Sequence, residues 1–100
     1  MLTLKHNLRF TKTYIRKYKK LTKNNKKLKK QISKTLELLS SDPRNPSLKS
    51  HKVYAKEFGL RLSSSVSADL RVIWDYDQNS QLIILILTIG THSGKNRVYN

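Results

Sequence analysis

The chain has 100 residues, and its 21 lysine and arginine residues against 6 acidic residues give a formal net charge of +15. This length predicts one small domain over residues 1–100 with a modest core. The absence of cysteine excludes a disulfide framework and a thiolate metal site. The N-terminus lacks the long apolar core of a signal peptide, and no apolar run approaches the about 20 residues of a membrane span, so we expect a cytoplasmic protein with no membrane contact.

The positive charge is concentrated in the first third of the chain, where thirteen basic residues precede the first acidic residue, Glu37. Such a field attracts polyanions, and nucleic acid is the usual one. An anionic membrane surface is less favoured, because the basic segments also need their apolar faces for the core. An acidic protein partner is a further candidate.

The predicted elements begin with a strand over residues 2–10, in which leucines alternate with polar residues. A first amphipathic helix follows, because apolar residues from Phe10 to Leu21 repeat at spacings of four, four and three, with lysine and arginine between them. Thr11 is placed to cap the N-terminus of this helix.

A second amphipathic helix spans Leu28 to Leu39, where the same spacing of apolar residues recurs. Either Asn24 or Asn25 is placed to cap it. Pro43 ends the helix, since proline cannot continue it. The two helices form a hairpin that must bury its apolar stripe against another layer.

Downstream of the helices we expect irregular chain as far as Lys52, and then a strand near Glu57–Ser63 followed by a polar loop of three serines. Two further strands form a β-hairpin, one alternating over Leu70–Tyr76 and one nearly continuous apolar run over Leu82–Ile89 that is typical of a strand buried on both faces. Asp77–Ser80 supplies the residues of the turn. The predicted fold is α+β, a β-α-α-β-β-β domain with the helical hairpin packed on a mostly antiparallel four-stranded sheet.

The part of the chain that follows the helices carries several short motifs. They are, in order, Asp42-Pro43-Arg44-Asn45-Pro46-Ser47-Leu48-Lys49-Ser50-His51-Lys52, Leu60-Arg61-Leu62, Leu70-Arg71-Val72-Ile73-Trp74, Ile89-Gly90 and Val98-Tyr99. Together these motifs resemble the RelE/ParE superfamily of bacterial toxins. The resemblance implies a RelE-like fold and the toxin of a type II toxin–antitoxin system. Its RelE and YafQ-like branch implies an endoribonuclease, or mRNA interferase, that cuts messenger RNA in the ribosomal A site without metal or cofactor and so inhibits translation.

The resemblance also implies catalytic residues, and their chemistry fits metal-free cleavage by attack of the 2′-hydroxyl on the phosphodiester. Arg71 matches the strand arginine of the family, and its guanidinium suits the charge that grows on phosphate. His92 follows Gly-Thr as in the YafQ-like proteins, and an imidazole that titrates near ~6.5 suits proton transfer. His51 is a second proton carrier, and Tyr99, with a free pKa near ~10, is expected to stack on a base or to transfer a proton.

The remaining predicted site residues contact RNA rather than react with it. They are Lys52, Arg61, Asp69, Lys95 and Arg97. Lys52 and Arg61 fit a basic groove along the RNA backbone, Arg97 or Lys95 fits a phosphate contact, and Asp69 falls where YafQ-like proteins carry an acidic residue. Ser65 stands where the YafQ-like pattern has a histidine.

Two other functions remain open from the sequence. One is a ParE-like inhibitor of DNA gyrase, which keeps the fold and needs no cleaving residues. The other is a basic RNA-binding protein without catalysis. Enzymes acting on small molecules are disfavoured, because the sequence has no glycine-rich phosphate loop, nucleophile elbow or metal-ligand cluster. For a toxin of this charge we expect an acidic antitoxin as the protein partner, with mRNA and the ribosome as targets.

Overall fold

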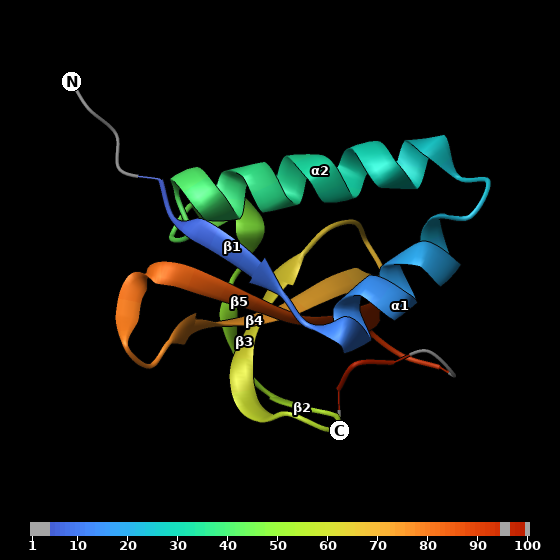
Figure 1. The fold of residues 1–100 in the computed structure, drawn as a ribbon. Helices are drawn as coiled ribbons and strands as arrows, with labels where there is room; N and C mark the ends of the chain where they lie inside the picture. Colours follow the sequence, from blue (N-terminus) through green and yellow to red (C-terminus); the bar gives the residue numbers. More distant parts are fainter. Residues whose placement is uncertain (1–4, 95–96, 100) are drawn as a thin grey trace.

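The computed structural model describes residues 5–94 and 97–99. Its elements are β1 (Asn7–Phe10), α1 (Lys12–Thr22), α2 (Lys26–Ser41), a 3-10 turn (Pro46–Leu48), β2 (His51–Ala55), β3 (Gly59–Ser65), β4 (Leu70–Asp77) and β5 (Ser80–Thr91). The strands form one sheet in the order β1-β5-β4-β3-β2, and both helices lie over one face of it (Figure 1). The predicted α+β class is confirmed. No helix among the described residues is long and apolar enough to span a membrane.

Both helices begin at the residues that the sequence indicates. The Thr11 side chain accepts a hydrogen bond from the amide of Tyr14 at 3.0 Å. The Asn25 side chain accepts one from the amide of Leu28 at 3.1 Å, whereas Asn24 adopts a left-handed backbone with φ 59° in the turn between the helices. Each cap satisfies an amide that the first helical turn leaves without a partner.

The first strand is parallel to its neighbour, β5, and lies at the edge of the sheet. Asn7–Phe10 pair with Ile83–Ile86, while positions 2–4 of the strand predicted over 2–10 lie outside the described residues. Backbone and side-chain bonds link its start to the end of α2, since the His6 amide donates to the Ser40 carbonyl at 2.7 Å and the Ser40 hydroxyl donates to the His6 carbonyl at 2.7 Å. The other three strand pairs are antiparallel.

The sheet has five strands where the sequence predicts four. The extra strand is β2, which begins at His51 inside the segment expected to be irregular and pairs antiparallel with β3. As an edge strand it exposes three of its five side chains, and Tyr54 is 68% exposed. An edge strand with charged residues shows little hydrophobic alternation, which is why the pattern fails there.

The three serines expected to form a loop belong to β3 instead, and this strand spans Gly59–Ser65 rather than Glu57–Ser63. Ser63 and Ser64 are fully buried. The Ser64 hydroxyl accepts a hydrogen bond of 2.7 Å from Nε1 of Trp74. Small hydroxyl side chains are therefore buried here because each has a polar partner, and such partners are invisible to a local sequence pattern.

The β4–β5 hairpin agrees with the prediction. The Asp77 carboxylate accepts a hydrogen bond of 2.9 Å from the Asn79 amide and fixes the turn. The first half of β5 is partly exposed, with Leu82 at 49%, and the second half, Ile86–Gly90, is buried on both faces. One core lies between the helices and the sheet, and a smaller one lies on the opposite face.

Candidate functional site

The face of the sheet opposite the helices carries several of the predicted site residues. Alternation along β3 and β4 places Arg61, Ser63 and Arg71 on this face, together with the buried Ile73 of the smaller core. Ser65 pairs in register with Arg71 and lies on the same face. The sequence therefore aligns these side chains on one surface although they come from two strands.

The C-terminal segment, residues 97–99, crosses this face. The Val98 amide donates to the Thr91 carbonyl at 3.0 Å, and the Lys56 amide donates to the Val98 carbonyl at 2.7 Å. Tyr99 forms a bridge with Ala55 at the end of β2. Val98 itself is 1% exposed and packs in the smaller core. The segment thus connects the ends of two strands at opposite sides of the site and holds Tyr99 over the sheet.

Tyr99 contacts two residues that are distant in the sequence. Its hydroxyl lies 2.7 Å from the hydroxyl of Ser63 in a hydrogen bond. Its ring lies edge-on to the ring of His92, with centroids 5.1 Å apart and an interplanar angle of 89°. The packing brings the rings of a phenol and an imidazole, two groups that can each transfer protons, into contact, while the phenol hydroxyl bonds to Ser63.

His92 is fixed next to the beginning of β4. Its amide donates to the Asp69 carbonyl at 2.7 Å, and the preceding residue, Thr91, pairs with Leu70. The side chain of His92 is exposed. The backbone of Asp69 therefore positions His92, and the Asp69 side chain is exposed beside it.

Arg71 lies beside the same end of β5, where it pairs in register with Gly90. Its Nη1 donates to the carbonyl oxygens of Ser67 at 2.8 Å and Leu70 at 3.1 Å. These carbonyls orient the guanidinium without neutralising its charge, since both are uncharged acceptors. The guanidinium has five N–H donors in a fixed fork, so this anchored side chain retains donors for an anion.

His51 lies on the same face as Arg71 but farther across the sheet, at the start of β2 opposite Ser63. Its Nδ1 lies 3.0 Å from the Lys49 carbonyl oxygen. A carbonyl only accepts, so this bond requires a proton on Nδ1 and leaves Nε2 of the neutral ring as the basic nitrogen. His51 is exposed, so Nε2 is accessible.

The predicted RNA-contact residues are placed differently from one another. Arg61 forms an ion pair of 3.0 Å with Asp75 and donates through Nε to the Phe58 carbonyl, so its charge is partly compensated. Lys52 pairs with Leu62 and so lies on the other face of the sheet from Arg71. Arg97 is exposed at the start of the C-terminal segment, and Lys95 lies outside the described residues.

The structure therefore brings Arg71, His92 and Tyr99 to one end of β4 and β5, and it adds Ser63, which the sequence interpretation did not include in the site. A strand alternation extended from Arg61 through residue 65 is the signal that places Ser63 on this face. Within residues 5–94 and 97–99, no three histidine or acidic side chains are grouped so as to hold a metal ion.

Comparison with known proteins identifies the family. Residues 8–95 match the model of the ParE toxin of type II toxin–antitoxin systems, parDE. The chain belongs to this toxin family. A search among curated protein sequences gives no match.

Solved structures show that the toxin has a RelE-like fold. It is similar to a chain of the Escherichia coli DinJ–YafQ toxin–antitoxin complex, with a TM-score of 0.66 and 17% identity over 88% of this chain and 93% of that one. It is also similar to a chain of the archaeal RelE–RelB complex from Pyrococcus horikoshii OT3, with a TM-score of 0.66 and 15% identity over 94% and 100% of the two chains. The YoeB dimer from Staphylococcus aureus gives a TM-score of 0.60 and 23% identity over 84% and 93%. At these identities the similarity establishes the fold.

Proposed function

We propose that the toxin is a metal-independent endoribonuclease that cuts messenger RNA in the ribosomal A site. The single observation that carries the proposal is the contact between the rings of His92 and Tyr99 at the end of the sheet where Arg71 lies. A protein that only binds RNA can stack bases on aromatic rings, but it has no need of an imidazole and a phenol, both able to transfer protons, beside an anchored arginine. The RelE-like fold of the toxin supports the same function.

The proposed reaction uses these side chains in separate roles. A base takes the proton of the 2′-hydroxyl, the 2′-oxygen attacks phosphorus, and the bond from phosphorus to the 5′-oxygen breaks. The 5′-oxygen takes a proton from an acid, which leaves a 2′,3′-cyclic phosphate and a 5′-hydroxyl. Arg71 stabilises the charge on the phosphate oxygens. His92, His51 and Tyr99 are the three groups for the proton transfers.

The first experiment is induced expression of the wild type beside Arg71→Ala and His92→Ala, with growth followed and transcripts mapped by primer extension. Lys27→Ala, on the exposed face of α2, is the matched control for loss of one positive charge. We expect growth arrest and new cuts in the wild type and the control. Both site variants should lose the cuts, by about 10²-fold or more, the scale of a lost transition-state donor.

A ParE-like inhibition of DNA gyrase is the second candidate, because the matching family model is that of a ParE toxin. It predicts growth arrest without cuts in RNA, and inhibition of supercoiling when the purified toxin is added to gyrase. Retention of arrest in both site variants would favour this function over the nuclease.

We also propose an acidic antitoxin as the partner, acting in the cytoplasm. The E. coli and P. horikoshii structures are complexes with the antitoxins DinJ and RelB, and a chain of charge +15 attracts a partner rich in Asp and Glu. The complex should weaken as salt rises. Affinity that is unchanged between low and high salt would argue against electrostatic capture.

A further inference from the structure

A cavity of about 370 Å³ lies between α1, the end of β5, the β2–β3 turn and the C-terminal segment. Its lining includes five basic side chains, Arg16, Lys17, Lys20, Lys56 and Arg97. Leu21 and Ile89 form its apolar part. This volume is within the range of ligand-binding pockets. The basic residues of α1 and of the β2–β3 turn are not among the site residues predicted from the sequence.

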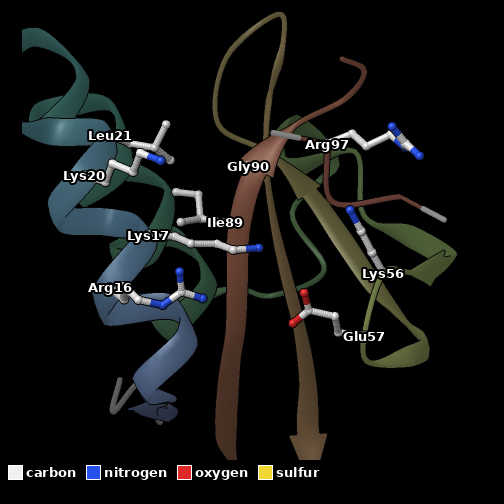
Figure 2. A pocket seen from close by; sticks show the side chains of 9 residues that line it. All are labelled: Arg16, Lys17, Lys20, Leu21, Lys56, Glu57, Ile89, Gly90 and Arg97. Carbon is white, nitrogen blue, oxygen red and sulfur yellow. The ribbon is translucent and has the colours of Figure 1, made fainter. Parts of the chain in front are cut away.

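The cations come from two sides of the cavity. Arg16 and Lys20 are one helical turn apart on α1 and share a face, and Lys17 beside them is partly buried. In Figure 2, the side chains of Arg16 and Lys17 extend from α1 across the cavity, and the Glu57 carboxylate points toward them from the opposite wall. Lys56 comes from that opposite side. A ligand in the cavity would therefore meet positive charge from both walls.

This concentration of charge lacks compensation within the protein. In the described part of the chain, the only ion pair within 4.0 Å joins Arg61 to Asp75, which do not line the cavity. Among the described residues of the lining, Glu57 alone is acidic. Like charges at close range destabilise the folded state by repulsion. An anion bound in the cavity would remove this repulsion, so the cavity favours an anionic ligand.

The position of the cavity points to a particular anion. Gly90 lines the cavity and pairs in register with Arg71, and Arg97 lines it two residues before Tyr99. The cavity is therefore continuous with the end of the sheet that carries the candidate site. We propose that it binds backbone phosphates of an RNA strand beside the phosphate held at Arg71. This inference rests on the proposed RNA substrate and extends it to a second binding site.

Glu57 gives the proposal a test that does not depend on removing a cation. It has a left-handed backbone, with φ 74°, a conformation that residues other than glycine adopt only at a cost in energy. Its carboxylate repels phosphate. Glu57→Gln keeps the backbone geometry and removes the negative charge, so RNA should bind about three-fold more tightly, the effect of a modest exposed charge interaction.

The main experiment measures binding of uncleavable 2′-O-methyl RNA of three and nine nucleotides to the purified full chain. The cavity variant is Lys17→Gln, Lys20→Gln and Lys56→Gln together. The control is Lys27→Gln, Lys30→Gln and Lys34→Gln together, which removes the same charge from exposed positions of α2. Thermal unfolding of both variants is measured to establish that each one folds.

We expect the cavity variant to bind the nine-nucleotide RNA at least ten-fold more weakly than the control does. The slope of log affinity against log salt should fall by about two, since each lost phosphate contact on a single strand contributes about 0.7. The three-nucleotide RNA should bind both variants equally, because it occupies only the site at Arg71. Equal losses for the long RNA in both variants would overturn the proposal.

Two added ligands separate other sources of negative charge. In one outcome, binding of inorganic triphosphate depends on the cavity lysines, and the length of the RNA has no effect on its affinity. The cavity then binds a small anion and not an RNA strand. If binding of a hexaglutamate peptide depends on those lysines and binding of RNA does not, the surface binds an acidic protein. Either result overturns the RNA assignment. Cleavage is measured separately, so a toxin that binds RNA through the cavity without cutting it would refute only the nuclease function.

Discussion

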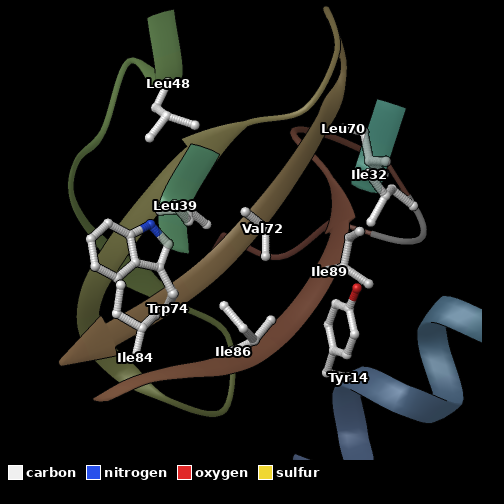
Figure 3. Close-up of a cluster of buried hydrophobic side chains, with 10 residues drawn as sticks. All are labelled: Tyr14, Ile32, Leu39, Leu48, Leu70, Val72, Trp74, Ile84, Ile86 and Ile89. Atoms are coloured by element: carbon white, nitrogen blue, oxygen red, sulfur yellow. The ribbon is translucent and has the colours of Figure 1, made fainter. Parts of the chain in front are cut away.

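The two faces of the sheet differ in what fills them. The face under the helices buries ten residues in one cluster, with Trp74, Ile86 and Ile89 against Tyr14 and Leu39 (Figure 3). A polar contact within it joins Trp74 to Ser64. This face is a conventional hydrophobic core, and burial of this kind is the main source of folding free energy.

The opposite face has a smaller buried cluster of four residues, Ala55, Ile73, Leu87 and Val98. Around them lie side chains with polar or charged groups, including Arg61, Arg71 and Tyr99, and the cover over them is the short C-terminal segment. Most of the buried core therefore lies on one face of the sheet, and the candidate catalytic side chains lie on the other. Substitutions on the helix face should act through folding, and those on the other face should also change the position of Tyr99.

The largest expected effect is on the helix face. Trp74→Ala removes a 1% exposed side chain and the hydrogen bond that its Nε1 donates to the Ser64 hydroxyl, so we expect a loss of about 3–5 kcal/mol in the free energy of unfolding. Urea unfolding measures it. Leu82→Ala, at a half-exposed position of β5, is the control and should cost much less. A similar cost for both would remove the distinction between core and surface.

Val98→Ala tests the smaller core. The side chain is 1% exposed, and its truncation should cost about 1–3 kcal/mol, at the lower end of core truncations because only two methyl groups are lost. The proposed RNA cleavage should fall further than the loss of folded protein explains, since Tyr99 is the next residue. Urea unfolding and cleavage are compared at a temperature where the variant is folded. Full activity in the folded variant would show that the segment does not position Tyr99.

The sequence predicts the helix face better than the opposite face, and the reason is physical. The caps at Thr11 and Asn25 and the spacing of apolar residues on the helices are local signals, and the structure confirms them. The buried serines of β3 are polar residues whose partners, Trp74 and Tyr99, lie 10 and 36 residues away. Local patterns contain no information about such partners.

The edge strands show the same limit. β2 exposes most of its side chains and gives no alternation, and the parallel pairing of β1 with β5 depends on tertiary packing. For the site, the family resemblance supplied Arg71, His92 and Tyr99. The register of β4 and β5 brings the backbones of Arg71 and Thr91, the residue before His92, to one end of the sheet. Tyr99 reaches His92 from the C-terminal segment, through a ring contact that no strand register predicts. The compensation of Arg61 by Asp75 was not predicted as part of the site, because an ion pair across β3 and β4 depends on their register.

Ser63→Ala tests the hydrogen bond to Tyr99. Loss of this bond should change the free energy of unfolding by only about 1 kcal/mol. If Tyr99 takes part in the proposed cleavage, the rate should fall several-fold, because the tyrosine hydroxyl loses the partner that holds its position. Ser63→Thr, which keeps a hydroxyl, should recover most of the rate. An unchanged cleavage rate in Ser63→Ala would restrict Ser63 to packing.

The smallest effect at neutral pH is expected at Tyr14, on the helix face. Its hydroxyl is buried and has no hydrogen-bond partner among the described residues. Such a group reduces stability, so Tyr14→Phe should raise the free energy of unfolding by about 1 kcal/mol near pH 7. The measurement is urea unfolding of both proteins. Destabilisation by the substitution would show that the hydroxyl is satisfied in solution.

The difference in stability between the wild type and Tyr14→Phe should grow at high pH, and the sign follows from the linkage of protonation to folding. Burial, and secondarily the neighbouring Tyr18, raises the pKa of Tyr14 well above its ordinary value of 10.0. Above that ordinary value the unfolded chain loses the tyrosine proton while the folded protein keeps it. The wild type therefore loses stability by up to about 1.4 kcal/mol per pH unit through this group, and Tyr14→Phe does not.

Lysine titration contributes equally to both proteins and cancels in the difference. Unfolding followed over a range of about pH 8 to 11.5 should give a constant difference below about pH 9.5 and a widening one above about pH 10. A difference in unfolding free energy that stays constant over the whole pH range would mean that the Tyr14 hydroxyl reaches solvent. This edge of the helix-covered core would then be as accessible to water as the opposite face of the sheet.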